Sequence, residues 1–186
     1  MQAEKGGKIV IGVTGGFCAG KTTVCNIFKE LDKDIEVIDA DEIAHKLLKI
    51  PDPEQRKKMA EEIFADEGRI RRWESTLHPL IIEEIKKRIE GSRARLILVD
   101  APLLIETGTD KLVDKIIVVR ASLDTQLSRS QSRGFSSQDA LRRIKRQLPL
   151  SEKMKKADYL IENDKEIEET RKQVEEVWRR IVQCLK

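Results

Sequence analysis

Short apolar runs rich in β-branched residues alternate along this chain with longer stretches in which apolar residues recur every three or four positions. The short runs are typical of strands buried on both faces, and the longer spacing is typical of amphipathic helices. Because helical sequence separates the strands, the pattern predicts a parallel sheet with helices on both faces. The predicted strands are residues 9–13, 35–38, 96–99, 116–119 and 159–161, and the two clearest helices are residues 21–31 and 167–185.

Two stretches interrupt the alternation. Residues 41–91 contain helical patterns without a candidate strand, and Pro79 suits the first turn of a helix there. Residues 122–147 predict two helices joined at Arg133-Gly134-Phe135, with Ser136 or Ser137 capping the second. We therefore expect a core of residues 1–40, 92–121 and 148–186, a substrate-side helical lobe in residues 41–91 and a mobile lid in residues 122–147.

Composition narrows the class of protein. The 186 residues are 39% hydrophobic and 37% charged, which fits one well-buried core, and no apolar run approaches the roughly 20 residues of a membrane span. The three cysteines are odd in number and fit no metal-ligand spacing, so we expect free thiols in a reducing cytoplasm. The first eight residues are polar, and no secretory leader is expected.

The positive charge is concentrated in one segment. Residues 121–147 hold six basic and two acidic residues, whereas the whole chain has a net charge of only +3. Arginines on a closing lid can neutralise the negative charge of a bound anion and exclude water. Nucleic-acid binding is the competing interpretation and predicts a steep salt dependence. Phe135 is the only aromatic residue in the segment, so no platform for base stacking is visible.

A glycine-rich phosphate-binding motif follows the first strand. Residues 15–22, GGFCAGKT, match the pattern GxxxxGK[ST] and lie between a predicted strand and a predicted helix. Glycines let the loop amides point at phosphate oxygens, and the helix N-terminus adds its dipole. Lys21 would contact the β and γ phosphates, and the Thr22 hydroxyl would bind Mg²⁺. The predicted ATP contacts in this region are Gly15, Gly16, Cys18, Ala19, Gly20, Lys21, Thr22 and Thr23.

Aspartates end two of the predicted strands. Asp100 ends the third strand, where a carboxylate can orient the Mg²⁺ shell. Asp39 and Asp41 follow the second strand, and transfer to a hydroxyl needs a carboxylate that takes the proton of the acceptor. One of the two could instead cap the next helix, and Asp41 stands where an N-cap is wanted. Spacing alone leaves open which of them is the base.

Several longer segments, in order, make the chain recognisable. They are IGVTGGFCAGKTT, VIDADEIAHKL, FADEGRIRRWESTLHPLI, VDAPLLIETG and KKADYLIEN, together with the spaced residues Gln126, Arg129, Arg133, Arg143 and Gln147. Together they resemble the dephospho-coenzyme A kinase family, which transfers the γ-phosphate of ATP to the ribose 3′-hydroxyl of dephospho-CoA. The glycine-rich motif is shared by many families, whereas VIDAD, LHPLI and DAPLLIE in this order are more specific.

The resemblance implies a three-layer α/β P-loop kinase fold with a five-stranded parallel sheet. It implies ATP with Mg²⁺ and dephospho-CoA as ligands, and no nucleic acid, membrane or obligate protein partner. Asp41 matches the catalytic base of the family, and Asp39 is expected close to the acceptor. Thr14 matches a threonine near the acceptor, and Arg143 matches a lid arginine that contacts the phosphates.

Further residues take their expected roles from the same resemblance. Arg56 and His78 match positions in the CoA-binding lobe, although His78 could equally be a structural histidine before Pro79. Asn163, after the fifth strand, is expected near the adenine. The segment Phe17-Cys18-Ala19 departs from the family, which usually has Ile-Gly-Ser there.

Two other functions are compatible with the motif alone. A kinase for another hydroxyl or monophosphate acceptor, such as a nucleoside or nucleotide, would share the phosphate loop, but the LHPLI and DAPLLIE segments argue against it. A GTP-driven switch would need an NKxD guanine signature and a DxxG segment. The chain has no NKxD sequence, and Asp100 is followed by Ala-Pro.

Overall fold

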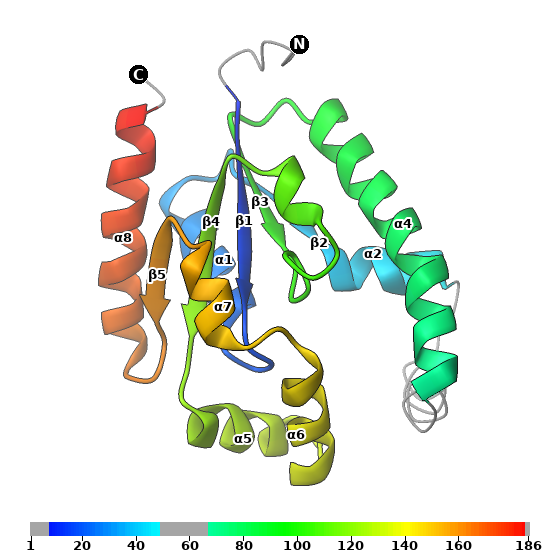
Figure 1. Ribbon diagram of the computed structural model, residues 1–186. Coiled ribbons are helices and arrows are strands. Elements are labelled where there is room, and N and C mark those ends of the chain that lie inside the picture. Colours follow the sequence, from blue (N-terminus) through cyan, green and yellow to red (C-terminus); the bar gives the residue numbers. More distant parts are fainter. Residues whose placement is uncertain (1–7, 49–66, 185–186) are drawn as a thin grey trace. The chain divides into compact units, whose positions relative to one another are not determined.

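The computed structural model describes residues 8–48 and 67–184 of the chain (Figure 1). The chain divides into two compact units. One unit comprises Met1–Ile38 and Ser92–Lys186, and the other comprises Asp39–Gly91. None of the helices in the described part of the chain is long and apolar enough to cross a membrane.

The core unit contains the predicted five-stranded parallel sheet, whose strands lie in the order β2-β3-β1-β4-β5. The central strand β1 pairs on both sides, with Ile11 opposite Leu98 of β3 and Lys115 of β4. Because the strands are parallel, their carboxyl ends lie at one edge of the sheet, which is where such sheets bind ligands. The strands are β1 (Ile9–Gly15), β2 (Glu36–Asp39), β3 (Leu96–Asp100), β4 (Lys115–Arg120) and β5 (Tyr159–Glu162).

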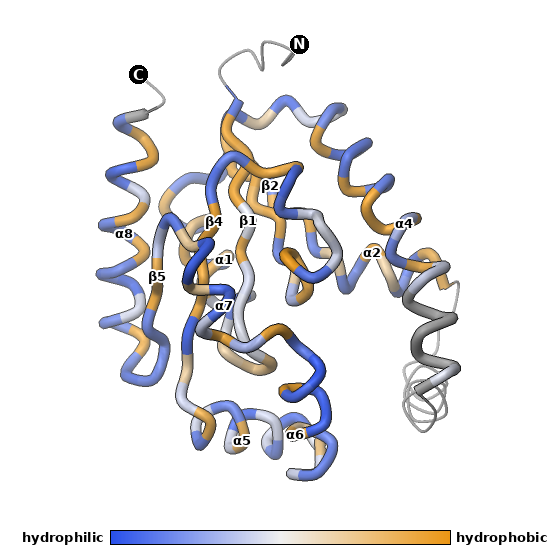
Figure 2. Tube along the Cα trace, in the orientation of Figure 1, coloured by the Kyte–Doolittle hydropathy of each residue, from blue (hydrophilic) through white to orange (hydrophobic). Residues whose placement is uncertain are grey.

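One face of the sheet packs against two helices. Ile11 and Val13 of β1 belong to a buried cluster with Phe28 of α1 (Lys21–Leu31) and Ile181 of α8 (Ile167–Cys184). Figure 2 shows apolar residues running along β1 and β4, while α8 alternates between apolar and polar positions. Burial of the apolar stripe of α1 against the sheet fixes the position of this helix. Its first turn therefore has a fixed place next to the end of β1.

Gly12 and Thr14, which alternate with Ile11 and Val13 along β1, face the opposite side of the sheet. A Cβ atom on Gly12 would lie 2.4 Å from Leu104 Cδ2, so the turn after β3 packs directly on the strand. The hydroxyl of Thr14 donates to the Pro102 carbonyl at 3.2 Å on the same side. Helix α7 (Leu150–Lys155) contacts β4 and lies in front of the sheet in Figure 1, whereas α1 lies behind it. The core therefore has the three predicted layers.

The two helices predicted in residues 122–147 are present as α5 (Leu123–Ser132) and α6 (Ser137–Arg146). Of the two serines proposed as the second cap, Ser136 is the one used, since its hydroxyl accepts from the Asp139 amide at 3.1 Å. The sequence did not predict α7 or the short 3-10 turn Thr109–Leu112. Both are too short for helical periodicity to be visible.

The second unit contains α2 (Ala40–Leu47) and α4 (Glu67–Gly91), which pack against each other. The prediction that Pro79 occupies a first helical turn is wrong, because α4 runs through it. Proline removes one N–H, which would have bonded to the carbonyl of Ser75 four residues earlier. Ser75 lies on an exposed part of the helix, where water can hydrate that carbonyl. The apolar stripe that includes the buried Ile85 continues the helix beyond the proline.

Replacing Phe28 by Ala tests the packing of α1 on the sheet. Phe28 is fully buried in the core cluster, so we expect the free energy of unfolding to fall by about 3–5 kcal/mol. Denaturant titration followed by circular dichroism measures this change. The exposed neighbour Lys29 is the matched control, and Lys29→Ala should change stability by no more than about 0.5 kcal/mol. Equal losses for the two variants would contradict the assigned core.

Candidate active site

The phosphate-binding motif forms a tight loop between β1 and α1. Gly20 has a φ of +97° and caps α1, a left-handed conformation that glycine adopts without steric cost. The Ala19 amide donates to the Gly16 carbonyl at 3.2 Å, and Lys21 Nζ donates to the same carbonyl at 3.2 Å. The loop and the first turn of α1 thus bring together the predicted contacts Gly15, Gly16, Cys18, Ala19, Gly20, Lys21, Thr22 and Thr23.

Cys18 fills the bend of this loop. Its φ of +56° is uncommon for a residue with a side chain, and the residue is only 7% exposed. A buried thiol is a small apolar group in packing terms and is poorly placed for reaction with solutes. Cys18 is therefore best described as a small side chain that fills a tight turn.

Two oxygen-bearing side chains meet beside the loop. The Thr22 hydroxyl donates to Asp100 Oδ2 at 3.2 Å, and Asp100 is 5% exposed at the end of β3. A hydroxyl and a carboxylate fit Mg²⁺, which prefers oxygen ligands and keeps several waters. No group of three or more His, Cys, Asp or Glu side chains that could hold a metal occurs in residues 8–48 and 67–184. A metal here would therefore depend on Thr22, Asp100, the nucleotide phosphates and water.

Arg143 of α6 lies against aromatic rings from two segments. Its guanidinium carbon is 5.6 Å from the ring centre of Phe17, in the phosphate loop, and 4.9 Å from that of Phe135, in the α5–α6 turn. The two rings meet edge to face, with centres 5.3 Å apart. Neither phenylalanine has a role that could be predicted from its position in the sequence. The contact brings the predicted lid arginine next to the loop.

A buried lysine that could not be recognised from the sequence lies next to the turn after β3. Lys153 of α7 is 1% exposed, and its ammonium donates to the Pro102 carbonyl at 2.6 Å and pairs with Glu106 Oε1 at 2.9 Å. The same Glu106 oxygen accepts the Leu148 amide at 2.9 Å, and the Pro102 carbonyl also accepts from Thr14. This network connects the end of the predicted lid with the residue before the phosphate loop.

The environment of Lys153 changes its acidity. Burial lowers the pKa of the ammonium below its usual range, the ion pair with Glu106 opposes this change, and the nearby Lys21 ammonium lowers the pKa further. The nearby Lys21 ammonium thus adds to the cost of protonating Lys153.

Asn163 is placed differently from a residue that contacts adenine with its side chain. It is 3% exposed, its Nδ2 atom donates to the Ala19 carbonyl at 2.8 Å, and its Oδ1 atom accepts from Thr170 at 2.9 Å. Both ends of the amide are therefore engaged within the protein.

The remaining predicted residues belong to the second unit. Asp39 caps α2, because its Oδ1 atom accepts the Glu42 amide at 3.0 Å. Of the two aspartates that could cap the helix, Asp39 is therefore the one that does, and Asp41 lies exposed in the first turn of α2. His78 is half-buried in α4. Arg56 lies outside the described residues.

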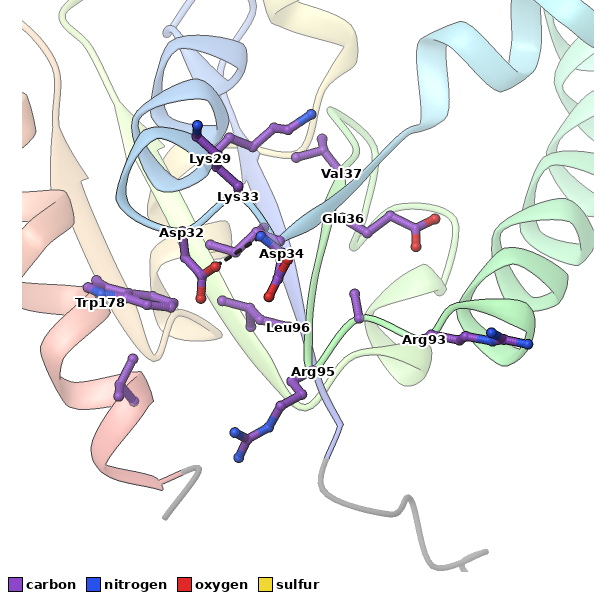
Figure 3. Close-up of a pocket in the computed structure, with 13 residues that line it drawn as sticks. Lys29, Asp32, Lys33, Asp34, Glu36, Val37, Arg93, Arg95, Leu96 and Trp178 are labelled. Carbon is purple, nitrogen blue, oxygen red and sulfur yellow. Dashed lines mark hydrogen bonds between the residues drawn. The ribbon is translucent and has the colours of Figure 1, made fainter.

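A cavity of about 790 Å³ lies in the core unit at some distance from this chemistry (Figure 3). It is lined by residues at or just before the start of β2 and β3, such as Glu36 and Arg95, and by Trp178 of α8. The amino ends of parallel strands are opposite the edge that carries the phosphate loop. The cavity, which carries side chains of both charges, is therefore separate from the candidate active site.

The lowered pKa of Lys153 predicts a pH dependence of stability. Between the folded-state pKa and the ordinary lysine pKa of about 10.4, the unfolded state binds more protons than the folded state, so stability should rise with pH. Lys153→Met removes this contribution. We expect the stability difference between wild type and variant to shift in favour of wild type as the pH rises through that window. Parallel denaturation curves measured at several alkaline pH values test this, and a difference independent of pH would contradict it.

Comparisons with known proteins agree with the geometry. The family model described as dephospho-CoA kinase matches residues 9–55 and 53–169. The dephospho-CoA kinase of Aquifex aeolicus (strain VF5) is 39% identical over 188 aligned positions, covering 90% of this chain and 95% of that protein. The dephospho-CoA kinase of Carboxydothermus hydrogenoformans is 37% identical over 188 positions, covering 89% and 90%.

Solved structures show the same fold. TT1252 from Thermus thermophilus aligns with a TM-score of 0.75 and 27% identity, covering 96% of this chain and 98% of that one. The dephospho-CoA kinase from Campylobacter jejuni aligns with a TM-score of 0.66 and 25% identity, covering 95% and 98%. A shikimate kinase from Acinetobacter baumannii, with a TM-score of 0.64 and 18% identity over 95% of this chain and 94% of that one, supports the fold alone. The chain belongs to the dephospho-CoA kinase family.

Proposed function

We propose that this chain transfers the γ-phosphate of ATP to the ribose 3′-hydroxyl of dephospho-CoA through the residues assembled around its phosphate loop. Family membership gives the overall reaction, the last step of coenzyme A biosynthesis. The observation that carries the assignment of residues is the contact between Thr22 and Asp100 beside a glycine-rich loop at the carboxyl edge of the sheet. Such an arrangement suits a nucleotide polyphosphate with its metal.

The core unit would hold ATP. The loop amides and the Lys21 ammonium bind the phosphates, and Lys21 exchanges its present acceptor, the Gly16 carbonyl, for phosphate oxygens. Thr22 and Asp100 would hold Mg²⁺. The bound ion would neutralise part of the negative charge on the phosphates.

Asp41 is the proposed base. It orients the acceptor hydroxyl and takes its proton, because a carboxylate is a suitable base for an alcohol whose oxygen attacks phosphorus. The helix cap supports Asp41 rather than Asp39 as the base. The Asp39 carboxylate already accepts a hydrogen bond at the N-terminus of α2. Thr14, Asp39, Arg56 and His78 remain predictions for binding of the acceptor.

Arg143 is proposed to stabilise the transferring phosphoryl group from the lid. Contact with Phe17 and Phe135 reduces the freedom of a long side chain that would otherwise lose rotamer entropy when it binds the phosphates. When a guanidinium stacks on an aromatic ring, its N–H donors lie in its own plane and remain available to phosphate oxygens.

The basic segment supports small-molecule substrates over nucleic acid. Arg129 contacts the carbonyls of Ala19 and Asn163, and Arg142 pairs with Asp139 at 2.6 Å. Arg143 contacts its two aromatic rings, so these three basic residues all have contacts within the protein. We propose that ATP and dephospho-CoA are the substrates, that the enzyme acts in the cytoplasm, and that it needs no nucleic acid, membrane or obligate protein partner.

An assay with Mg²⁺, ATP and dephospho-CoA tests the reaction and the base together. We expect the wild type to form ADP and a product whose new phosphate is on the 3′-oxygen. We expect Asp41→Asn to bind ATP with near-normal affinity while turnover falls by at least about 100-fold, because the amide cannot accept the proton. Product mapping by NMR and nucleotide titration provide the two measurements.

A panel with a nucleoside and a nucleoside monophosphate as acceptors serves as the control for this assay. Faster turnover of either compound than of dephospho-CoA would count against the proposed acceptor. Unchanged turnover in Asp41→Asn would remove Asp41 from the base role and leave the phosphate loop assignment intact.

The proposed metal ligands predict a changed Mg²⁺ requirement. Thr22→Val and Asp100→Asn each remove one of the oxygens that fit the ion, so the Mg²⁺ concentration for half-maximal activity should rise by about tenfold or more. Titration of activity with Mg²⁺ at fixed ATP measures this shift. Ser151→Ala, at an exposed position in α7, should leave the titration unchanged. A requirement identical to wild type in both variants would exclude the two residues as ligands.

A further inference from the structure

The carbonyl oxygen of Ala19, in the middle of the phosphate loop, accepts hydrogen bonds from two distant segments. Arg129 Nη1 of α5 donates to it at 3.3 Å, and Asn163 Nδ2, after β5, donates to it at 2.8 Å. Arg129 Nη2 also donates to the Asn163 carbonyl at 2.8 Å, so the two donors are joined to each other. The Thr170 hydroxyl of α8 donates to Asn163 Oδ1 at 2.9 Å and fixes which end of the amide faces Ala19.

These four groups are closely packed. Asn163 and Thr170 are 3% and 0% exposed, and Arg129 is half-buried. A Cβ atom at Gly20 would lie 2.0 Å from Asn163 Nδ2, so the amide rests directly on the loop backbone. On the same face of α5, Gln126 lies close to Gly16, where an added Cβ would be 2.5 Å from Gln126 Oε1. The loop is therefore closely packed against side chains at Gly16 and Gly20.

The direction of the Ala19 carbonyl determines the direction of the next amide. A trans peptide is planar, and its C=O and N–H point to opposite sides. Holding the Ala19 carbonyl toward Arg129 and Asn163 therefore keeps the Gly20 N–H pointing away from them. Gly20 cannot enforce this direction itself, because glycine adopts positive and negative φ with similar ease. An external restraint is needed if this donor is to be ready for an anion.

We propose that Arg129, Asn163 and Thr170 form a carbonyl clamp, a set of positioning residues that hold the Ala19–Gly20 peptide so that the Gly20 N–H faces the nucleotide phosphates. The inference rests on the proposed role of the loop in ATP binding. It gives Asn163 an indirect part in ATP binding, through the loop, in place of a side-chain contact with adenine. The clamp acts on the polyphosphate and does not distinguish the base.

Inorganic tripolyphosphate separates these two roles, because it has the phosphates of ATP without adenine. Its inhibition constant against ATP and the dissociation constant of ATP are measured for the full-length enzyme and its variants. Arg129→Met keeps the length of the side chain but removes the donors. We expect both constants to rise by about tenfold, which is the size of effect expected when hydrogen bonds to a charged ligand are lost. The KM for dephospho-CoA should stay within about twofold of wild type.

Three further variants complete the test. Arg129→Lys keeps the charge but not the fork that reaches two carbonyls, so it should remain impaired. Asn163→Asp places an oxygen against the Ala19 carbonyl and should weaken ATP and tripolyphosphate together, and Thr170→Val should do so by a smaller factor, about threefold. Arg179→Gln removes an exposed arginine of α8 and should leave all constants unchanged. Arg129 decides the outcome if a substitution at the buried Asn163 prevents folding.

Each alternative result overturns the clamp. Weaker ATP binding with unchanged tripolyphosphate inhibition would assign these residues to adenine. Full recovery in Arg129→Lys would reduce Arg129 to a general positive charge. A parallel rise in the KM for dephospho-CoA, with a lowered melting temperature, would indicate general loosening of the fold. Absence of competition between tripolyphosphate and ATP in the wild type would instead contradict the phosphate loop assignment itself, and the clamp with it.

Discussion

The direction of the peptide groups in one short loop is the constraint on which the site depends. An anion is bound by N–H donors, so carbonyls in the same loop must turn away from it and find donors elsewhere. The protein supplies these donors from its own chain: Lys21 and the Ala19 amide serve the Gly16 carbonyl, and Arg129 and Asn163 serve the Ala19 carbonyl. The buried strand β1 and the packed helix α1 fix the two ends of the loop in space.

The sheet was predictable because fully buried parallel strands consist of continuous apolar runs, and each of the five runs became a strand. Local sequence rules did not identify the N-cap of α2, because two nearby aspartates met the same rule. Asp39 and Asp41 both suit an N-cap, and the helix begins at Ala40, so the cap is Asp39. The Pro79 rule failed because packing of the apolar stripe outweighed the loss of one hydrogen bond on an exposed face.

The supporting residues of the site were much less visible in the sequence than the loop itself. A motif reveals residues that are neighbours in the chain, but Asn163 lies 144 positions from Ala19 and Lys153 lies 51 positions from Pro102. The lysine looked like one of many charged residues on a short amphipathic segment, and its burial depends on Glu106 being placed opposite it. Phe17 differs from the residue usually found at this position of the loop, which makes it noticeable in the sequence. Its contact with Phe135 could not be inferred from spacing.

The close packing of Leu104 on Gly12 limits how this region of the gene can vary. Leu104 is fully buried, and the Ala101 amide, in the turn that follows Asp100, donates to the Val13 carbonyl at 3.0 Å. Every base change at the Gly12 codon that alters the amino acid introduces at least a Cβ atom, which would require the buried Leu104 side chain to shift. A substitution at Gly12, in the middle of β1, would therefore disturb the turn after β3 and, through it, the position of the Asp100 carboxylate that ends β3.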